Sequence, residues 1–196
     1  MMKKLSILAA ILLIALSANA LEPINNGDRV PDFSAIDENG DTWKLSDQRA
    51  NYIVFYFYPA AFTGGCTQQA CSYRDHDSDF NRLGAEVVGI SGDEHENLKQ
   101  FKESHNLNFT LLSDTDGKIA EMLGVPTKDG GTIEKEVDGK TLELTRGVTT
   151  SRWTYIVDGN KSRLIYKDET VTAATDPEDV LKFITTHNER KSCVIR

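Results

Sequence analysis

Two cysteines that lie close together in the chain, Cys66 and Cys71, are the first candidates for chemistry. They follow an apolar run, 52–58, which predicts a buried strand, and a turn that contains Gly64 and Gly65. A cysteine at the passage from a buried strand into a helix faces unpaired backbone N–H groups and the positive end of the helix dipole. Both stabilise a thiolate, the nucleophilic form of this side chain. The pattern therefore predicts thiol chemistry at Cys66.

A longer motif surrounds these cysteines. Pro59, Thr63 and Cys66 form the pattern P-x-x-x-T-x-x-C, and Cys71 follows in a C-x4-C spacing. This stretch resembles the active site of the peroxiredoxins, and the spacing is similar to that of their peroxiredoxin Q branch, also called bacterioferritin comigratory protein. The resemblance runs from about residue 27 to about residue 187 and includes the segments GDRVPDF, LNFTLLSD and SRWTYIVD.

The resemblance implies a thioredoxin-like fold and a thiol-dependent peroxidase that reduces hydrogen peroxide and organic hydroperoxides. In such an enzyme Cys66 attacks the peroxide and becomes a sulfenic acid, and Cys71 resolves it as an intramolecular disulfide. Arg152 matches the family's active-site arginine, whose charge would hold the thiolate and whose donors would bind the peroxide oxygens. Thr63 would offer its hydroxyl to the thiolate or the peroxide, and Pro59 would shield the site from water.

Helix geometry adds a constraint to this scheme. Residues i and i+5 of an α-helix lie roughly 8.5 Å apart between Cα atoms, whereas a disulfide needs Cα atoms within about 7 Å. Cys66 and Cys71 therefore cannot bridge while both stay in one intact helix, and we expect the helix start to unwind in each cycle. Gly64 departs from the family pattern, which commonly has proline there, and makes the turn more flexible.

Other interpretations of the cysteines remain open. Nearby cysteines in an exported protein often form a structural disulfide, which would suit a non-enzymatic thioredoxin-like module. An exported thiol–disulfide oxidoreductase acting on protein substrates is a further alternative, although such enzymes usually carry C-x-x-C. A metal site from Cys66, Cys71 and His76 is disfavoured, because the spacing is unlike a zinc site and a fourth ligand is missing. Cys193 is expected to be a free thiol, with a resolving role as its alternative.

The first twenty residues predict a targeting segment. Lys3 and Lys4 form a basic start, 5–16 an apolar core, and 18–20 an A-x-A cleavage motif. The apolar core is too short for a comfortable membrane span. We therefore expect an export signal that is cleaved after Ala20, and a periplasmic or secreted protein.

Residues 21–196 are expected to form one domain with a short flexible C-terminal tail. Loss of the two signal lysines changes the net charge from −8 to −10. An acidic chain without a basic run argues against nucleic acid and anionic membranes as partners. The sequence has no phosphate loop or dinucleotide fingerprint, so no cofactor and no metal are expected. The expected partners are a hydroperoxide substrate and a thioredoxin-type protein reductant, and a monomer is expected.

The hydrophobic pattern predicts an α/β domain with a mixed central sheet, flanking helices and peripheral hairpins. Hairpins are predicted around 39–40, 138–139 and 158–160, and a further buried strand at 86–91. Asp93 and Glu96 have capping-box spacing at the start of a helix that runs to about His105. Asp176 with Pro177 is predicted to cap the last helix.

Overall fold

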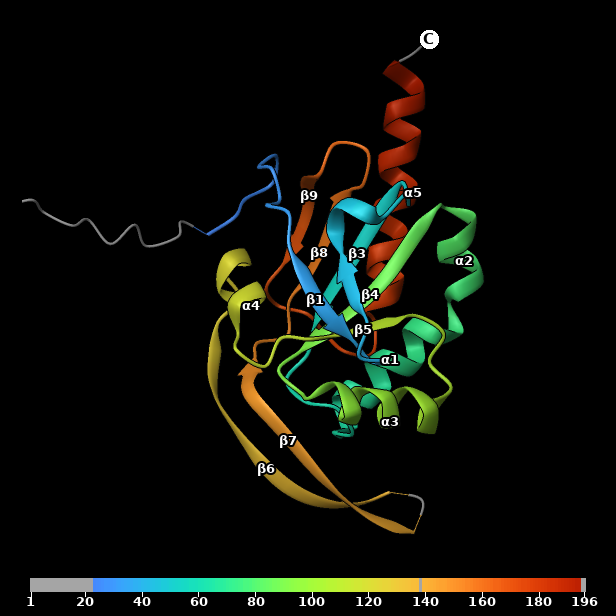
Figure 1. Cartoon of the computed structure of the whole chain (residues 1–196). Coiled ribbons are helices and arrows are strands. Elements are labelled where there is room, and N and C mark those ends of the chain that lie inside the picture. Colours follow the sequence, from blue (N-terminus) through green and yellow to red (C-terminus); the bar gives the residue numbers. More distant parts are fainter. Residues whose placement is uncertain (1–22, 138, 195–196) are drawn as a thin grey trace, which may run out of the picture.

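The computed structural model describes residues 23–137 and 139–194 (Figure 1). The predicted export signal, 1–20, lies outside the described residues. Within the part of the chain that is described, no helix has the length and apolar character needed to cross a membrane.

A seven-stranded mixed sheet forms the centre of the molecule, with strand order β2-β1-β5-β4-β3-β8-β9. The strands β3, β4 and β5 are parallel, and β1 and β8 join this group on either side in antiparallel pairing. The strands are β1 Ser34–Asp37, β2 Thr42–Lys44, β3 Tyr52–Phe57, β4 Ala85–Ser91, β5 Thr110–Ser113, β8 Thr154–Asp158 and β9 Arg163–Asp168.

Helices cover both faces of this sheet, and the central strand β3 is therefore buried on both sides. All six residues of β3 are buried, as expected of a strand between two layers. Val54 and Tyr56 pack in one core cluster with the helices α1, α2, α3 and α5, and Phe55 packs in a second cluster with α4. The helices are α1 Gly64–Asp75, α2 Asp77–Arg82, α3 His95–His105, α4 Lys118–Leu123 and α5 Asp176–Val194, with a short 3₁₀ turn at Leu45–Asp47.

The predicted mixed sheet, its flanking helices and its hairpins are confirmed, and the details that differ concern the helices α2, α3 and α5. The sequence did not predict α2, and α5 continues through Cys193 to Val194 where a tail was expected, since no proline or glycine interrupts its last turns. The capping box predicted for α3 is wrong. Glu94, and not Asp93, is the N-cap residue of α3, and its side chain makes no capping hydrogen bond. The Asp93 carboxylate is buried and bonds to residues outside this helix.

A long hairpin of β6 (Thr127–Val137) and β7 (Lys140–Thr150) forms a separate two-stranded sheet. Figure 1 shows it running out from the central sheet and curving below α3. This peripheral hairpin still contacts the core, since Leu144 is buried, and Val137 and Leu142 pack against the core cluster that contains α3. The hairpin is thus held against the same layer as α1.

A buried ion pair anchors the base of this hairpin. Arg146 Nε donates to Asp93 Oδ1 at 3.1 Å, with 0% of the Asp93 side chain exposed. The other oxygen of Asp93 accepts from the Ala61 backbone N–H and the Ser91 hydroxyl, each at 2.8 Å. One carboxylate therefore joins the hairpin, the end of β4 and the loop after β3.

Replacing this carboxylate should be costly. Asp93→Ala leaves a buried guanidinium without its counter-ion, and we expect the free energy of unfolding to fall by about 3–5 kcal/mol. The control is Asp79→Ala, which breaks the exposed Asp79–Arg82 pair and should cost less than about 1 kcal/mol. Urea denaturation measures both, and equal losses would show that Asp93 is not an anchor.

Candidate active site

Cys66 lies near the start of α1, directly after the turn that leaves β3. It is the third residue of α1, it is a free cysteine, and only 1% of its surface is exposed. Thr63 precedes the helix with extended backbone angles (φ −88°, ψ 149°) and is the N-cap residue. Cys66 therefore belongs to the first turn of a helix that follows a buried strand, as the sequence predicted.

The turn before Cys66 is braced from several elements. Phe62 adopts a left-handed backbone conformation, with φ 61°, which is uncommon for a bulky residue. Its carbonyl accepts a hydrogen bond from Lys135 of the hairpin, and the preceding Ala61 N–H donates to Asp93. Thr150 donates to the Tyr58 carbonyl at 2.9 Å. Such over-determined contacts can hold a residue in a sparsely populated conformation.

The guanidinium of Arg152 lies directly against the Cys66 sulfur. Arg152 Nη2 is 3.2 Å from Cys66 Sγ, and Nη1 donates to the side-chain carbonyl of Gln69, one turn further along α1. The strand pairing produces this proximity, because the Phe57 N–H donates to the Trp153 carbonyl at 2.8 Å and so places Arg152 beside the end of β3. At this distance the guanidinium can donate a hydrogen bond to the sulfur and brings a fixed positive charge beside it.

Gln69 connects this arginine to a buried carboxylate. Its amide nitrogen donates to Asp176 Oδ2 at 2.7 Å, and the same oxygen accepts from the Tyr73 hydroxyl at 2.6 Å and from the Thr154 hydroxyl at 2.9 Å. Burial raises the pKa of Asp176, while these three hydrogen bonds act in the opposite direction. Asp176 is the first residue of α5, and its carboxylate thus points into the core and not along its own helix.

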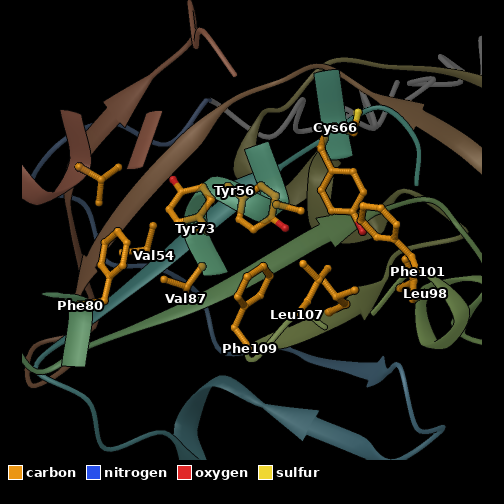
Figure 2. Close-up of a cluster of buried hydrophobic side chains, with 14 of the residues drawn as sticks. Val54, Tyr56, Cys66, Tyr73, Phe80, Val87, Leu98, Phe101, Leu107 and Phe109 are labelled. Atoms are coloured by element: carbon orange, nitrogen blue, oxygen red, sulfur yellow. The ribbon is translucent and has the colours of Figure 1, made fainter. Parts of the chain in front are cut away.

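Aromatic side chains form the floor beneath Cys66. Tyr56 stacks on Tyr58 with ring centroids 5.3 Å apart and on Tyr73 at 4.7 Å, and all three are fully buried. Figure 2 shows Cys66 at the edge of a row of aromatic rings that includes Tyr56, Tyr73 and Phe80. Burial raises the pKa of the three tyrosines well above the usual value, so the phenols stay neutral. Cys66 is therefore backed by a dry, uncharged layer.

Cys71 lies on the same helix as Cys66 but in different surroundings. It is half-buried and free, and Arg74 Nη1 lies 3.6 Å from its sulfur while donating to the His105 carbonyl at 2.6 Å. Both cysteines belong to one continuous α1, from Gly64 to Asp75. The structure therefore places the two thiols in the arrangement for which helix geometry forbids a direct disulfide.

Thr63 and Pro59 lie in the segment that joins β3 to α1. The Thr63 hydroxyl donates to the Ala60 carbonyl at 2.9 Å, which is a contact within the turn and not the expected bond to sulfur or peroxide. Pro59 is half-buried and lines a groove of about 260 Å³ together with residues at the base of the β6–β7 hairpin. Thr63 is thus the cap residue of α1, three residues before Cys66, and Pro59 lines a groove at the base of the hairpin.

The sequence named Cys66, Cys71, Arg152, Thr63 and Pro59. The structure places Arg152 against Cys66 and Thr63 at the cap of α1, whereas Cys71 lies further along this helix and Pro59 lines a groove at the base of the hairpin. The sequence did not identify Gln69, Asp93 or Asp176 as parts of the site. Gln69 had a detectable signal, since it follows Cys66 by one helical turn and so lies on the same face of α1. Asp93 and Asp176 gave no such signal, because both looked like ordinary helix caps.

Comparison with known proteins gives a consistent result. The AhpC/TSA family model matches residues 26–162. Peroxiredoxin Bcp of Escherichia coli (strain K12) is 44% identical over 123 residues, which cover 63% of this chain and 75% of that protein. The chloroplastic peroxiredoxin Q of Populus jackii is 46% identical over 110 residues, or 56% of this chain. The match spans only 52%, about half, of the length of that chloroplastic relative.

Solved structures agree on the fold. Peroxidoxin BcpB of Mycobacterium tuberculosis superposes with a TM-score of 0.69 at 28% identity, covering 83% of this chain and 97% of that one. A peroxiredoxin Q structure from Xanthomonas campestris superposes with a TM-score of 0.64 at 23% identity, covering 79% and 90%. The thioredoxin-like fold that the motif implied is confirmed.

The backbone at the start of α1 allows a stabilising substitution. A Cβ atom at Gly64 would meet nothing within 4 Å, and the preceding Thr63 is extended, as a residue before proline prefers. Gly64 is also the first helical residue, a favoured position for proline. We therefore expect Gly64→Pro to raise the free energy of unfolding by about 0.4–1 kcal/mol, measured by thermal and urea denaturation.

The control for this substitution is the neighbouring glycine. Gly65→Pro would place the helical Gly64 before a proline, where the helical conformation is disfavoured, so it should destabilise the protein. A destabilised Gly64→Pro variant would show that the turn needs glycine for a reason other than those given.

Proposed function

We propose a mechanism for this chain, which belongs to the AhpC/TSA family in its peroxiredoxin Q/Bcp branch and is a thiol peroxidase that reduces peroxides. In this mechanism the Cys66 thiolate attacks the substrate. One observation carries the assignment. Arg152 Nη2 lies 3.2 Å from the sulfur of Cys66, a buried cysteine at a helix start. Cys66 thus has both a fixed cation and the helix N–H groups to favour its thiolate, whereas Cys71 lies in the middle of α1.

The first step follows from this geometry. The Cys66 thiolate attacks one peroxide oxygen, an S–O bond forms and the O–O bond breaks. The sulfur is oxidised to a sulfenic acid, and the other oxygen leaves as water or an alcohol once it has taken up a proton. Charge moves from the sulfur to the leaving oxygen during this step. Arg152 can stabilise the charge on both atoms because its guanidinium has several donors in a fixed plane.

The second step forms a disulfide. The Cys71 thiol attacks the sulfenic acid of Cys66, an S–S bond forms and water leaves, which protects Cys66 from further oxidation. A thioredoxin-type dithiol then reduces the disulfide by transferring two electrons and two protons. Because both cysteines lie in α1, the first turns of this helix unwind before the disulfide forms.

The remaining assignments complete this proposal. Thr63 offers its hydroxyl to the thiolate or the bound peroxide once it turns from Ala60, and Pro59 keeps water from the sulfur. The substrates are hydrogen peroxide and organic hydroperoxides, and the protein acts as a monomer. The predicted export signal directs it to the periplasm or outside the cell, so its dithiol donor must be in the same compartment. Cys193, exposed near the end of α5, takes no part in the cycle.

Mass spectrometry after one equivalent of hydrogen peroxide tests the two cysteine roles. We expect a Cys66–Cys71 disulfide in the wild type, and a Cys66 sulfenic acid that a dimedone probe captures in Cys71→Ser. Cys66→Ser should consume peroxide at least 1,000 times more slowly, because the attacking thiolate is gone. Cys193→Ser is the control and should behave as wild type.

Two outcomes would contradict this assignment. A disulfide to Cys193 would replace Cys71 as the resolving residue. Failure of the reduced wild type to react rapidly with any hydroperoxide would remove the peroxidase and favour a structural disulfide or a protein-directed oxidoreductase.

Amide hydrogen exchange tests the unwinding. We expect amides 67–73 to lose protection in the oxidised wild type compared with the reduced protein, because a disulfide cannot form within an intact helix. The reduced and peroxide-treated Cys71→Ser variant provides the control and should keep its protection. Equal protection of this segment in reduced and oxidised wild type would refute the unwinding.

A further inference from the structure

A buried carboxylate lies behind the active site without touching the reacting atoms. Asp176 is 2% exposed, and its Oδ2 accepts hydrogen bonds from Gln69 and Tyr73 of α1 and from Thr154 of β8. All three donors are neutral and each donor residue is fully buried. Burying an anion among neutral donors costs free energy, and this cost suggests that the carboxylate has a specific role.

The link from Asp176 to the active site is the side-chain amide of Gln69. This amide is fully buried and both of its ends are used: the oxygen accepts from Arg152 and the nitrogen donates to Asp176. An amide rotated by half a turn would direct its NH₂ group at the guanidinium and its oxygen at the carboxylate. Both contacts would then be repulsive, since a guanidinium only donates and a carboxylate only accepts hydrogen bonds.

The orientation of Gln69 in turn fixes the arginine. Arg152 has a planar, forked head group, so holding Nη1 on the Gln69 oxygen determines where Nη2 lies. Nη2 is the atom 3.2 Å from Cys66 Sγ. A chain of contacts thus runs from the start of α5 through α1 to the sulfur.

We propose that Asp176 is a positioning residue: through Gln69 it holds the Arg152 guanidinium against Cys66 in the geometry that the peroxide reaction needs. The proposal rests on the proposed function for its effect on catalysis. It also gives α5 a role in the active site, since the first residue of this helix sets the orientation of the Gln69 side chain in α1.

The test uses rates of peroxide consumption by reduced protein in the alkaline range where Cys66 is fully ionised. Asp176→Leu removes the acceptor for Gln69 at similar side-chain size, and we expect a 10- to 100-fold slower reaction. Asp176→Asn is the milder variant, whose amide can face Gln69 with either end, and we expect a two- to fivefold slower reaction. Asp114→Asn is the matched control: it changes another buried carboxylate, which accepts hydrogen bonds from the backbone of α4 and not from Gln69, and the rate should stay unchanged.

A double-mutant cycle separates positioning from mere structural support. In an Arg152→Met background the group that Asp176 positions is absent, so neither Asp176 substitution should slow the reaction further. An unchanged rate in a folded Asp176 variant, or an equal loss with and without Arg152, would overturn the proposal. If Asp176→Leu does not fold, the Asp176→Asn arm supplies both outcomes.

Alkylation of Cys66 by iodoacetamide distinguishes a failure of this proposal from a failure of the proposed function. It needs no peroxide, and at neutral pH Asp176→Leu should slow it at least threefold in the wild-type background and not in Arg152→Met. If this pattern holds while no hydroperoxide reacts with the wild type, the positioning survives and the peroxidase does not. If the wild type reacts with peroxide but this alkylation pattern is absent, the peroxidase survives and the positioning role of Asp176 does not.

Discussion

The contact between Arg152 and Cys66 is the constraint on which the rest of the site depends. A cation must lie within about 3 Å of a sulfur that is itself almost wholly buried, and the two residues are far apart in the sequence. The antiparallel pairing of β3 with β8 meets this requirement. It brings the end of β3, which leads to Cys66, beside the segment before β8 that carries Arg152. The sheet order is thus a condition for the chemistry.

The second requirement is that the turn carrying Cys66 keeps its shape. Left-handed Phe62 stays in place because its neighbours are held from outside: Ala61 by Asp93, and the Phe62 carbonyl by Lys135. Asp93 also binds Arg146, so the β6–β7 hairpin supports the turn at two points. In the proposed cycle the same turn must also release α1 so that Cys66 and Cys71 can form a disulfide. Rigid bracing before Thr63 and an adaptable Gly64-Gly65 pair after it reconcile these demands.

Local patterns in the sequence predicted most of this architecture, and non-local contacts account for what they missed. The apolar run of β3, the turn glycines and the Cys66 motif are each legible within a few residues. Asp93 and Asp176 are different: each carries the local signature of a helix cap, yet each is buried against residues more than twenty positions away. Propensity favoured the cap because it considers neighbours in sequence, and tertiary burial decided otherwise.

The most direct test of this account compares the wild type with Arg152→Met in stopped-flow reactions of the reduced proteins with hydrogen peroxide. The pH is raised until Cys66 is fully ionised in both, so that only the effect of the guanidinium on the reacting peroxide remains. The account predicts that the second-order rate constant of the variant is about 100- to 1,000-fold lower, as expected when a preorganised donor is removed. Equal rate constants would contradict it, and would leave Arg152 no role beyond the ionisation of the thiol.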